Sequence, residues 1–275
     1  MTPAVEVGGL APGDAAAVEA LLSDLPHVYP GADVWLARTL RETAAGGASC
    51  SIARVGGKMA GVLIDKPKPE GRRKLSTLYV DRWARGRGAA RALLDEAMRR
   101  WWAEGVAEAY VTCRVPRDDA LIECLSSRGF AAGPLLPGRY GTGRDEQVLS
   151  WRPRRRTAVF SLWKAYADAI WSGEKRYEFR RRRMSVAPGD RVLVYETAPA
   201  SAVVGEFIAG ALVWGTPAQV RAAVGAAGGP GLDEYFAGAE MVSGVRVVAP
   251  LRYARPRPLS DFGLVRPPLS YAFLR

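Results

Sequence analysis

The segment of this 275-residue chain that best suits ligand binding, by residue type and spacing, contains two glycines that alternate with two arginines. They lie in the run Arg85-Gly86-Arg87-Gly88-Ala89-Ala90, which follows an apolar strand pattern and precedes an amphipathic helix pattern. Glycine lets the backbone approach a ligand closely, and the amides of a loop at a helix N-terminus attract anions. The run therefore predicts a phosphate-binding turn formed by Arg85, Gly86, Arg87, Gly88, Ala89 and Ala90.

Groups that can carry a proton lie at several positions of the first half. Asp65 ends one predicted strand, Asp81 follows the next, and Glu146 begins the last strand. His27 is the only histidine, which excludes a multi-histidine metal site, and no metal site is predicted. Acid–base chemistry requires a side chain within reach of the reacting proton, and the sequence does not define which group that is. The candidates for proton transfer are His27, Asp65, Asp81, Tyr140 and Glu146.

A second set of charged and aromatic residues lies in the second half. Lys164 starts a predicted helix, whereas Lys175, Glu178 and Arg180 lie on or near a short predicted strand. Strand alternation places residues 176, 178 and 180 on one side and Lys175 on the other. Positively charged side chains beside aromatic rings can bind the phosphates and bases of a nucleic acid. The alternative is that Glu178 and Arg180 form an ion pair on one face of the strand and serve only to stabilise it. The predicted ligand site comprises Lys164, Lys175, Glu178, Arg180 and Tyr195.

Residues 1–150 alternate predicted helices and strands. Apolar residues recur with a helical period from Asp14 to Leu25 and from Ala90 to Trp101, and Gly105 ends the second of these helices. The other predicted elements are helices at 33–44 and 120–127 and strands at 50–55, 59–64, 75–80, 109–113 and 146–151. This alternation is typical of an α/β fold with a mixed sheet and helices.

The sequence changes character at residues 151–156, a basic segment that contains a proline. We therefore expect a first domain at 1–150, a basic linker at 151–156 and a second domain at 157–275. Short strand patterns separated by turn residues favour a small β-barrel with flanking helices for the second domain. Its predicted strands are 158–161, 177–179, 192–197, 203–214, 245–248 and 271–274, with helices at 164–172, 217–224 and 232–236.

Positive charge is concentrated in the second half. The net charge of the chain is +11; residues 1–150 hold 20 basic and 18 acidic residues, and residues 151–275 hold 19 and 10. Such an imbalance favours a polyanionic partner, most simply nucleic acid, although a soluble basic surface is the alternative. Three cysteines without metal or disulfide spacing, and no membrane-length apolar run or signal-peptide core, predict a cytoplasmic protein. The oligomeric state is not defined by the sequence.

The glycine-arginine turn and its flanking elements resemble the R/Q-x-x-G-x-G/A motif of the GNAT acetyltransferases. The segment from Asp118 to Phe130 is similar to the family's late segment that ends in Gly-Phe. The resemblance implies a GNAT fold, with the pyrophosphate of acetyl-coenzyme A at residues 85–90 and its pantetheine arm beside Tyr79 and Val80. Many members carry a tyrosine four residues before that glycine, where it protonates the leaving thiolate. This chain has Leu125 there, so no such tyrosine is carried over.

Residues 161–181 resemble the signature of ASCH domains, which are PUA-like β-barrels, and the resemblance continues to residues 268–271. ASCH family members are associated with RNA or DNA binding, and some hydrolyse acetylated cytidine or cleave RNA. The nucleoside-hydrolysing members carry a threonine nucleophile three residues after a lysine that matches Lys175. Glu178 occupies that position here, and the loss of the hydroxyl argues against the same covalent chemistry.

These patterns predict an acetyl-coenzyme A-dependent N-acetyltransferase whose basic ASCH domain recruits RNA, a ribonucleoprotein or a nucleotide-like acceptor. Acetyl-coenzyme A would be a cosubstrate, and no membrane partner is expected. Two alternatives stay open at this point. One is a nucleic-acid-binding regulator that senses acetyl-coenzyme A without turnover, and the other is an amidohydrolase or ribonuclease activity of the ASCH domain.

Overall fold

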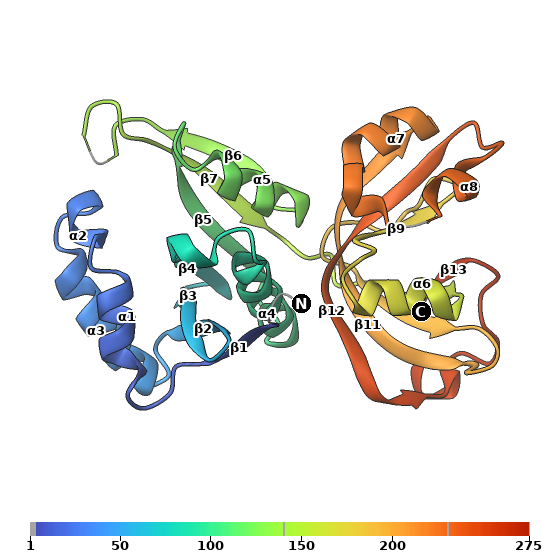
Figure 1. Cartoon of the computed structure of the whole chain (residues 1–275), viewed down its shortest axis with the longest axis horizontal. Helices are drawn as coiled ribbons and strands as arrows, with labels where there is room; N and C mark the ends of the chain where they lie inside the picture. Colours follow the sequence, from blue (N-terminus) through green and yellow to red (C-terminus); the bar gives the residue numbers. More distant parts are fainter. Residues whose placement is uncertain (1–3, 140, 230, 275) are drawn as a thin grey trace. The chain divides into compact units, whose positions relative to one another are not determined.

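A seven-stranded sheet forms the centre of the first of two units into which the chain divides (Figure 1). The computed structural model describes residues 4–139, 141–229 and 231–274, and the first unit contains the residues up to 124 together with 131–150. Strands β1 to β4 pair antiparallel with one another, and β5 joins β4 in parallel. The spatial order is β1 (Val5–Gly9), β2 (Ser49–Val55), β3 (Lys58–Lys68), β4 (Arg72–Val80), β5 (Glu108–Val115), β7 (Asp145–Trp151) and β6 (Ala131–Leu136).

Helices cover both faces of this sheet (Figure 1). α1 (Asp14–Leu21) and α3 (Ala32–Ala44) pack apolar side chains such as Val18 and Leu36 against Ile52 of β2. The preceding β2 residue, Ser51, points to the opposite face, where its hydroxyl donates to Glu96 of α4 (Ala89–Ala103) at 2.9 Å. The alternation of β2 therefore separates α1 and α3 from α4. The short helices are α2 (Leu25–Val28), the 3-10 turn η1 (Arg82–Ala84) and α5 (Asp119–Ser127).

The first predicted helix is interrupted in the structure. The sequence pattern runs from residue 14 to residue 25, but α1 ends at Leu21 and a separate helix, α2, begins at Leu25. Pro26 accounts for the break, because proline is tolerated in the first turn of a helix but not in its interior. Strands β1 and β6 extend the sheet beyond the predicted strands. Both contain glycine, and β6 contains a proline, residues that are poor in strands.

Strands β4 and β5 separate after a short paired segment. In the described residues, Arg72, Arg73 and Lys74 pair with residues 108–110, and β4 then continues to Val80 without β5. β4 also bulges against β3: Ile64 pairs with Thr77 and Asp65 with Leu75, which leaves Ser76 as the extra residue. A bulge bends its strand and increases the local twist. A wedge therefore opens between two parallel strands along residues 75–80.

The second unit contains a six-stranded sheet that curls into a half-barrel, as the PUA-like expectation requires (Figure 1). β8 and β10 are parallel, and the other neighbours are antiparallel. Three register shifts between β11 and β12 bend the two longest strands and contribute to the curl. The order is β13 (Tyr271–Phe273), β8 (Thr157–Leu162), β10 (Arg191–Glu196), β11 (Ala202–Gly215), β12 (Val242–Arg257) and β9 (Tyr177–Arg180).

The main core of the second unit joins this sheet to α6 (Lys164–Trp171), whose Ala167 and Ile170 pack with Phe160 and Phe207. Helix α7 (Pro217–Val224) begins with a capping box between Thr216 and Gln219. The remaining short helices are η2 (Gly225–Gly228), α8 (Leu232–Phe236) and η3 (Leu259–Phe262). Across the described ranges, no helix combines the length and apolar character needed to span a membrane.

Asp65 forms a buried ion cluster beside the β4 bulge. Its side chain is inaccessible to solvent; Oδ1 accepts from Arg73 Nη1 of β4 at 2.8 Å, and Oδ2 accepts from Arg100 Nη2 of α4 at 2.5 Å. A charge removed from water is tolerated when it is paired and hydrogen-bonded, as this one is. Both carboxylate oxygens are engaged by guanidinium groups, so we assign Asp65 a structural role rather than the proton transfer for which its sequence position makes it a candidate.

Replacing Asp65 by asparagine should lower the free energy of unfolding of the first unit by about 3 kcal/mol, because two partly buried arginines would lose their common counter-charge. The measurement is urea denaturation with backbone hydrogen exchange followed over residues 4–139. Glu19→Gln, at an exposed position of α1, is the control and should stay within about 0.5 kcal/mol of the unmodified protein. Equal losses in the two variants would contradict the structural role of Asp65.

Candidate functional sites

The turn at residues 85–90 leads from η1 into α4 and has the geometry of an anion site. Gly86 and Gly88 have φ values of +76° and +89°, and no heavy atom lies within 4 Å of the position of a Cβ on either. Gly88 is the N-cap of α4 and supplies no side-chain cap, so the first-turn amides of the helix can receive an anion. The Arg85 and Arg87 side chains are exposed beside the turn. The residues present therefore fit a diphosphate group.

The backbone edge of β4 continues the site away from the turn. Tyr79 packs partly against the core under α1 and α3, and Val80 is half-buried. The Val80 carbonyl accepts a hydrogen bond from Arg85 Nε at 3.3 Å, which links the end of the strand to the turn. Because β4 leaves β5 after Lys74, its edge can accept an extended molecule in the wedge.

A cavity of about 290 Å³ lies at the start of this wedge. Glu146 of β7 lines it with a side chain that is 2% exposed, and its Oε2 accepts no hydrogen bond from the described residues. The Nε atom of Arg139 lies 3.7 Å from that oxygen. Glu146 also borders a second cavity of about 190 Å³ lined by His27 and Arg117. The larger cavity is lined by Leu25, Tyr29, Pro30, Gly31, Ala32, Trp35, Lys74, Leu75, Ser76, Thr77, Thr112 and Glu146.

Lys74 contributes a cation to the larger cavity. Burial lowers the pKa of its ammonium group, and the positive charges of Arg139 and Lys68 lower that pKa further, while the negative charge of Glu146 raises it. Lys74 is the last β4 residue that pairs with β5, which places it at the branch point of the wedge. The cavity therefore contains one buried acid on β7 and one half-buried cation on β4, two strands that lie on either side of β5.

The remaining proton-transfer candidates differ in position. His27 is exposed and borders the smaller cavity. Asp81 starts the turn before η1, where its carbonyl accepts from the Ala84 amide at 3.0 Å, and it lines neither cavity. Tyr140 lies outside the described residues. Leu125 is fully buried on α5. Glu146 is thus the predicted candidate that the structure brings into the larger cavity.

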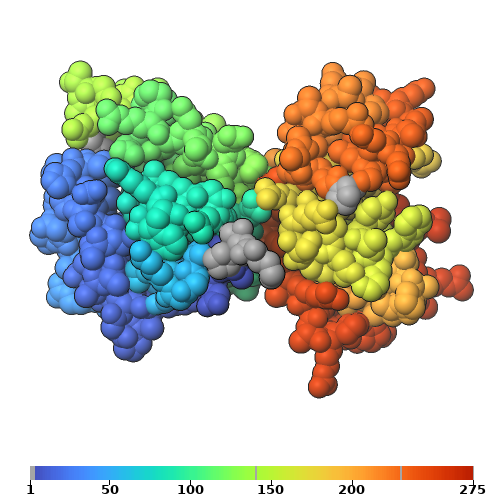
Figure 2. All heavy atoms as spheres, viewed as in Figure 1, coloured from blue at the N-terminus to red at the C-terminus, as the bar shows by residue number. Residues whose placement is uncertain are grey.

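A cavity of about 210 Å³ in the second unit lies between α6, β9 and the segment around α8. Figure 2 shows the yellow residues of α6 beside the orange segment on one face of that unit. Trp163 is 70% exposed at this cavity, and its ring stacks on Tyr166 with 6.0 Å between centroids. The lining residues are Ser161, Leu162, Trp163, Tyr166, Lys175, Glu178, Phe179, Arg180, Gly228, Gly231, Leu232, Tyr235 and Leu269.

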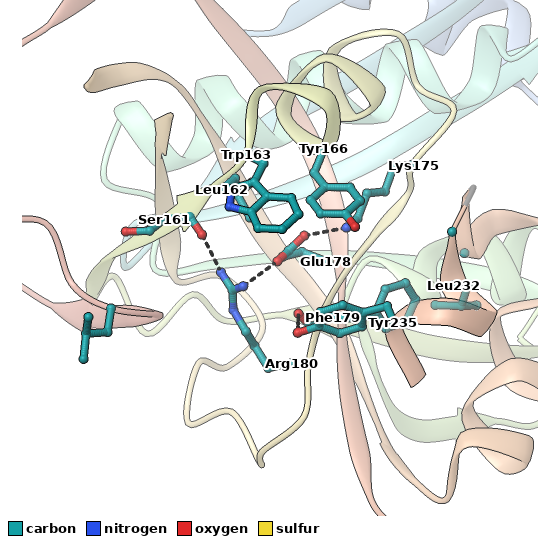
Figure 3. Close-up of a pocket in the computed structure, with 13 residues that line it drawn as sticks. Ser161, Leu162, Trp163, Tyr166, Lys175, Glu178, Phe179, Arg180, Leu232 and Tyr235 are labelled. Carbon is teal, nitrogen blue, oxygen red and sulfur yellow. Dashed lines mark hydrogen bonds and ion pairs between the residues drawn. The ribbon is translucent and has the colours of Figure 1, made fainter. Parts of the chain in front are cut away.

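Three charged side chains in the wall of this cavity form a chain of ion pairs (Figure 3). Lys175 Nζ lies 2.8 Å from Glu178 Oε2, and Arg180 Nη1 lies 3.2 Å from Glu178 Oε1. The prediction that Lys175 points away from Glu178 is wrong. Lys175 precedes β9, so the alternation of the strand does not apply to it. Two cations against one carboxylate leave a net positive charge in the cavity wall.

Neighbouring groups hold these side chains in place. Arg180 Nη2 donates to the carbonyls of Ser161 at 3.2 Å and Ser270 at 3.4 Å. Gly229 has a φ of +82°, and a Cβ there would lie 3.2 Å from Lys175 Cα, so this close contact requires glycine. Burial raises the pKa of Tyr235, whose hydroxyl donates to the Phe179 carbonyl at 3.3 Å. The cavity wall is thus held by hydrogen bonds on several sides.

Two residues predicted for this site lie elsewhere. Lys164 pairs with Asp168 one turn further along the exposed face of α6 and does not line the cavity. Tyr195 is 6% exposed and packs in a separate core cluster with Val159 and Leu193. The aromatic residues that do line the cavity are Trp163, Tyr166, Phe179 and Tyr235, of which the first two lie one helical turn apart in the ASCH-like segment. In the described ranges, no group of three or more His, Cys, Asp or Glu side chains could hold a metal ion.

The sequence comparison decides the family of the first unit. The model described as "Acetyltransferase (GNAT) family" matches residues 15–130. This match identifies a GNAT-family domain within residues 15–130. A crystal structure from Desulfovibrio desulfuricans that is assigned to the GNAT family is 24% identical, covers 54% of this chain and 99% of its own, and has a TM-score of 0.47. The family match confirms the predicted GNAT domain, and the antiparallel pairing of β3 with β4 beside the parallel pairing of β4 with β5 confirms the expected mixed sheet.

The second unit is similar to ASCH proteins of Zymomonas mobilis. A curated "ASCH domain-containing ribonuclease" from that organism is 44% identical over 63 residues, which make up 23% of this chain and 43% of the relative. A crystal structure of ASCH from Zymomonas mobilis is 32% identical, covers 43% of this chain and 87% of its own, and has a TM-score of 0.38. The chain thus joins a GNAT-family domain to a segment that is similar to ASCH proteins, and it spans less than half the length of the curated relative that it matches.

Replacing Gly88 by glutamate should abolish coenzyme A binding to the GNAT-family domain, because a carboxylate would enter the anion site at the start of α4. Gly57→Glu is a matched control: Gly57 also has a positive φ, +77°, and open space around its Cβ position, but it lies in the β2–β3 turn. Isothermal calorimetry with coenzyme A should show binding to the control and none to Gly88→Glu. Equal affinities in the two variants would contradict the assignment of the turn.

Proposed function

We propose that the protein transfers the acetyl group of acetyl-coenzyme A to an amine. The observation that carries this proposal is the GNAT-family match over a segment whose uncapped helix N-terminus lies beside an open strand wedge. The amides of the turn at residues 85–90 would bind the pyrophosphate, and the edge of β4 up to Val80 would bind the pantetheine arm. This arrangement would direct the thioester toward the cavity that contains Glu146.

We assign Glu146 as the proton acceptor. A protonated amine in the larger cavity gives one proton to the Glu146 carboxylate, whose Oε2 has no hydrogen-bond donor among the described residues. The neutral nitrogen then attacks the carbonyl carbon of the thioester. The C–N bond forms, the C–S bond breaks, and the electron pair of that bond leaves with the sulfur. The second proton released by the nitrogen reaches the thiolate through water, since Leu125 is buried and carries no acidic proton.

Glu146→Gln should lower kcat by about 10²-fold to 10⁴-fold while leaving coenzyme A affinity unchanged, because the amide cannot take up the proton of the amine. Glu123→Gln, at an exposed position of α5, removes the same charge outside the cavities and is the control. Thiol release from acetyl-coenzyme A, followed with a panel of amines, gives kcat, and calorimetry gives the affinity. An unchanged kcat in Glu146→Gln would exclude this role.

Product identification separates an enzyme from a regulator. Mass spectrometry should find an acetylated amine whose formation requires Gly88. Binding of coenzyme A without transfer to any amine, amino acid, peptide or aminoacyl-tRNA offered would instead favour a protein that senses acetyl-coenzyme A.

We further propose that residues 157–275, after the basic segment 151–156, form a domain that binds single-stranded RNA. The exposed Trp163, stacked on Tyr166, offers a surface for a base, and Lys175 with Arg180 offers positive charge to the adjoining phosphate. The similarity of this part of the chain to a ribonuclease supports the same class of ligand. Bound RNA would be an acetyl acceptor or would bring one to the protein.

Trp163→Ala should weaken binding of a single-stranded RNA dodecamer by about 1–3 kcal/mol, the usual value of one base–aromatic stack. Trp214→Ala is the control, since this indole is also partly exposed, at 41%, but lies on β11 away from the cavity. Fluorescence anisotropy at several salt concentrations should give an affinity that falls with a slope of about −0.7 per phosphate neutralised. Identical losses in the two variants would exclude the cavity as the RNA site. Cleavage of the RNA that depends on Lys175 would favour a ribonuclease.

A further inference from the structure

The larger cavity of the GNAT-family domain contains a cation that acetyl transfer by itself does not require. Lys74 and Glu146 both line this cavity, yet the Lys74 ammonium forms no ion pair with a carboxylate of the described residues. Of the described residues that line this cavity, Lys74 is the only Lys, Arg or His. An ammonium group removed from water without a counter-charge is unfavourable, so the position favours a ligand that brings an anion.

The surrounding charges strengthen that preference. Arg139 and Lys68 add positive potential at Lys74, and the opposing negative charge comes from Glu146. Glu146 already has Arg139 as an ion-pair partner at 3.7 Å. A bound anion would therefore meet Lys74 in a region where positive charge exceeds negative charge.

The rest of the wall is mostly apolar. Leu25 lines it from α2, Tyr29 from the position directly after α2, Trp35 from α3 and Leu75 from β4. A volume of about 290 Å³ is at the lower end of the range for small-molecule sites, which suits a molecule of amino-acid size. The cavity thus offers a carboxylate, an ammonium group and an apolar wall to one small ligand.

We propose that the acetyl acceptor is a free α-amino acid with an apolar side chain, whose ammonium group faces Glu146 and whose carboxylate pairs with Lys74. The acetyl step of this inference rests on the proposed function, whereas the binding step does not. An amine without a carboxylate would leave the half-buried Lys74 without a counter-charge from the described residues, so the cavity discriminates against simple amines and amides.

The test compares matched acceptors on the full chain. L-Leucine, L-methionine and L-phenylalanine are each paired with their carboxamides, and acetyl transfer is followed by thiol release. We expect kcat/KM to be at least about tenfold higher for the amino acid than for its amide. Lys74→Met should remove this preference mainly through KM. Lys58→Met, which removes the same charge from an exposed residue at the start of β3, outside the cavity wall, should retain it.

Calorimetry with the same compounds, in the presence of coenzyme A, separates the two proposals. Binding of an amino acid that requires Lys74, without acetyl transfer, would support the zwitterion site and overturn the proposed reaction. Acetyl transfer to amines with no preference for a carboxylate would support the reaction and overturn the zwitterion site. Absence of any Lys74-dependent preference in both binding and turnover would also overturn it.

Discussion

The first unit depends on the ion cluster around one buried carboxylate. Asp65 joins β3 to β4 through its ion pair with Arg73, and it joins β3 to α4 through its ion pair with Arg100. These ion pairs lie beside the bulge at which Ser76 of β4 has no partner residue on β3. An α-helix is stiff, so holding α4 against the sheet near Arg100 also orients its first turn. The same cluster supports β4 where that strand loses β5 as a neighbour. The anion site and the wedge therefore share one electrostatic anchor.

Charged side chains line a cavity in each unit, but they are arranged differently. In the second unit Glu178 lies between Lys175 and Arg180, so each cation has a partner within the wall. In the first unit Lys74 has no carboxylate partner among the described residues, although Glu146 lines the same cavity. Unpaired buried charge is unfavourable, and a ligand of opposite charge gains most where the protein supplies no partner. The cavity of the second unit instead offers a positively charged wall, held by hydrogen bonds, beside the exposed ring of Trp163.

Local patterns predicted most elements because they depend on short-range rules. Hydrophobic periodicity indicated α3, α4 and α7, and the glycines at 86 and 88 indicated a turn with positive φ. The interruption between α1 and α2 follows from Pro26, whereas the added strands β1 and β6 depend on how they pair in the sheet. The position of Lys175 was missed for a similar reason, since it lies before β9 and turns toward Glu178.

The sequence by itself determined the α/β class of the first unit, the glycine turn at residues 85–90 and the resemblance to GNAT and ASCH domains, because these follow from residue spacing along the chain. Only the tertiary structure decided which charged groups act together. Asp65 and Glu146 are both strand carboxylates in the sequence, but two arginines from β4 and α4 engage Asp65, while Glu146 faces a cavity. Pairing of buried charges depends on residues far apart in the chain, which local patterns do not specify.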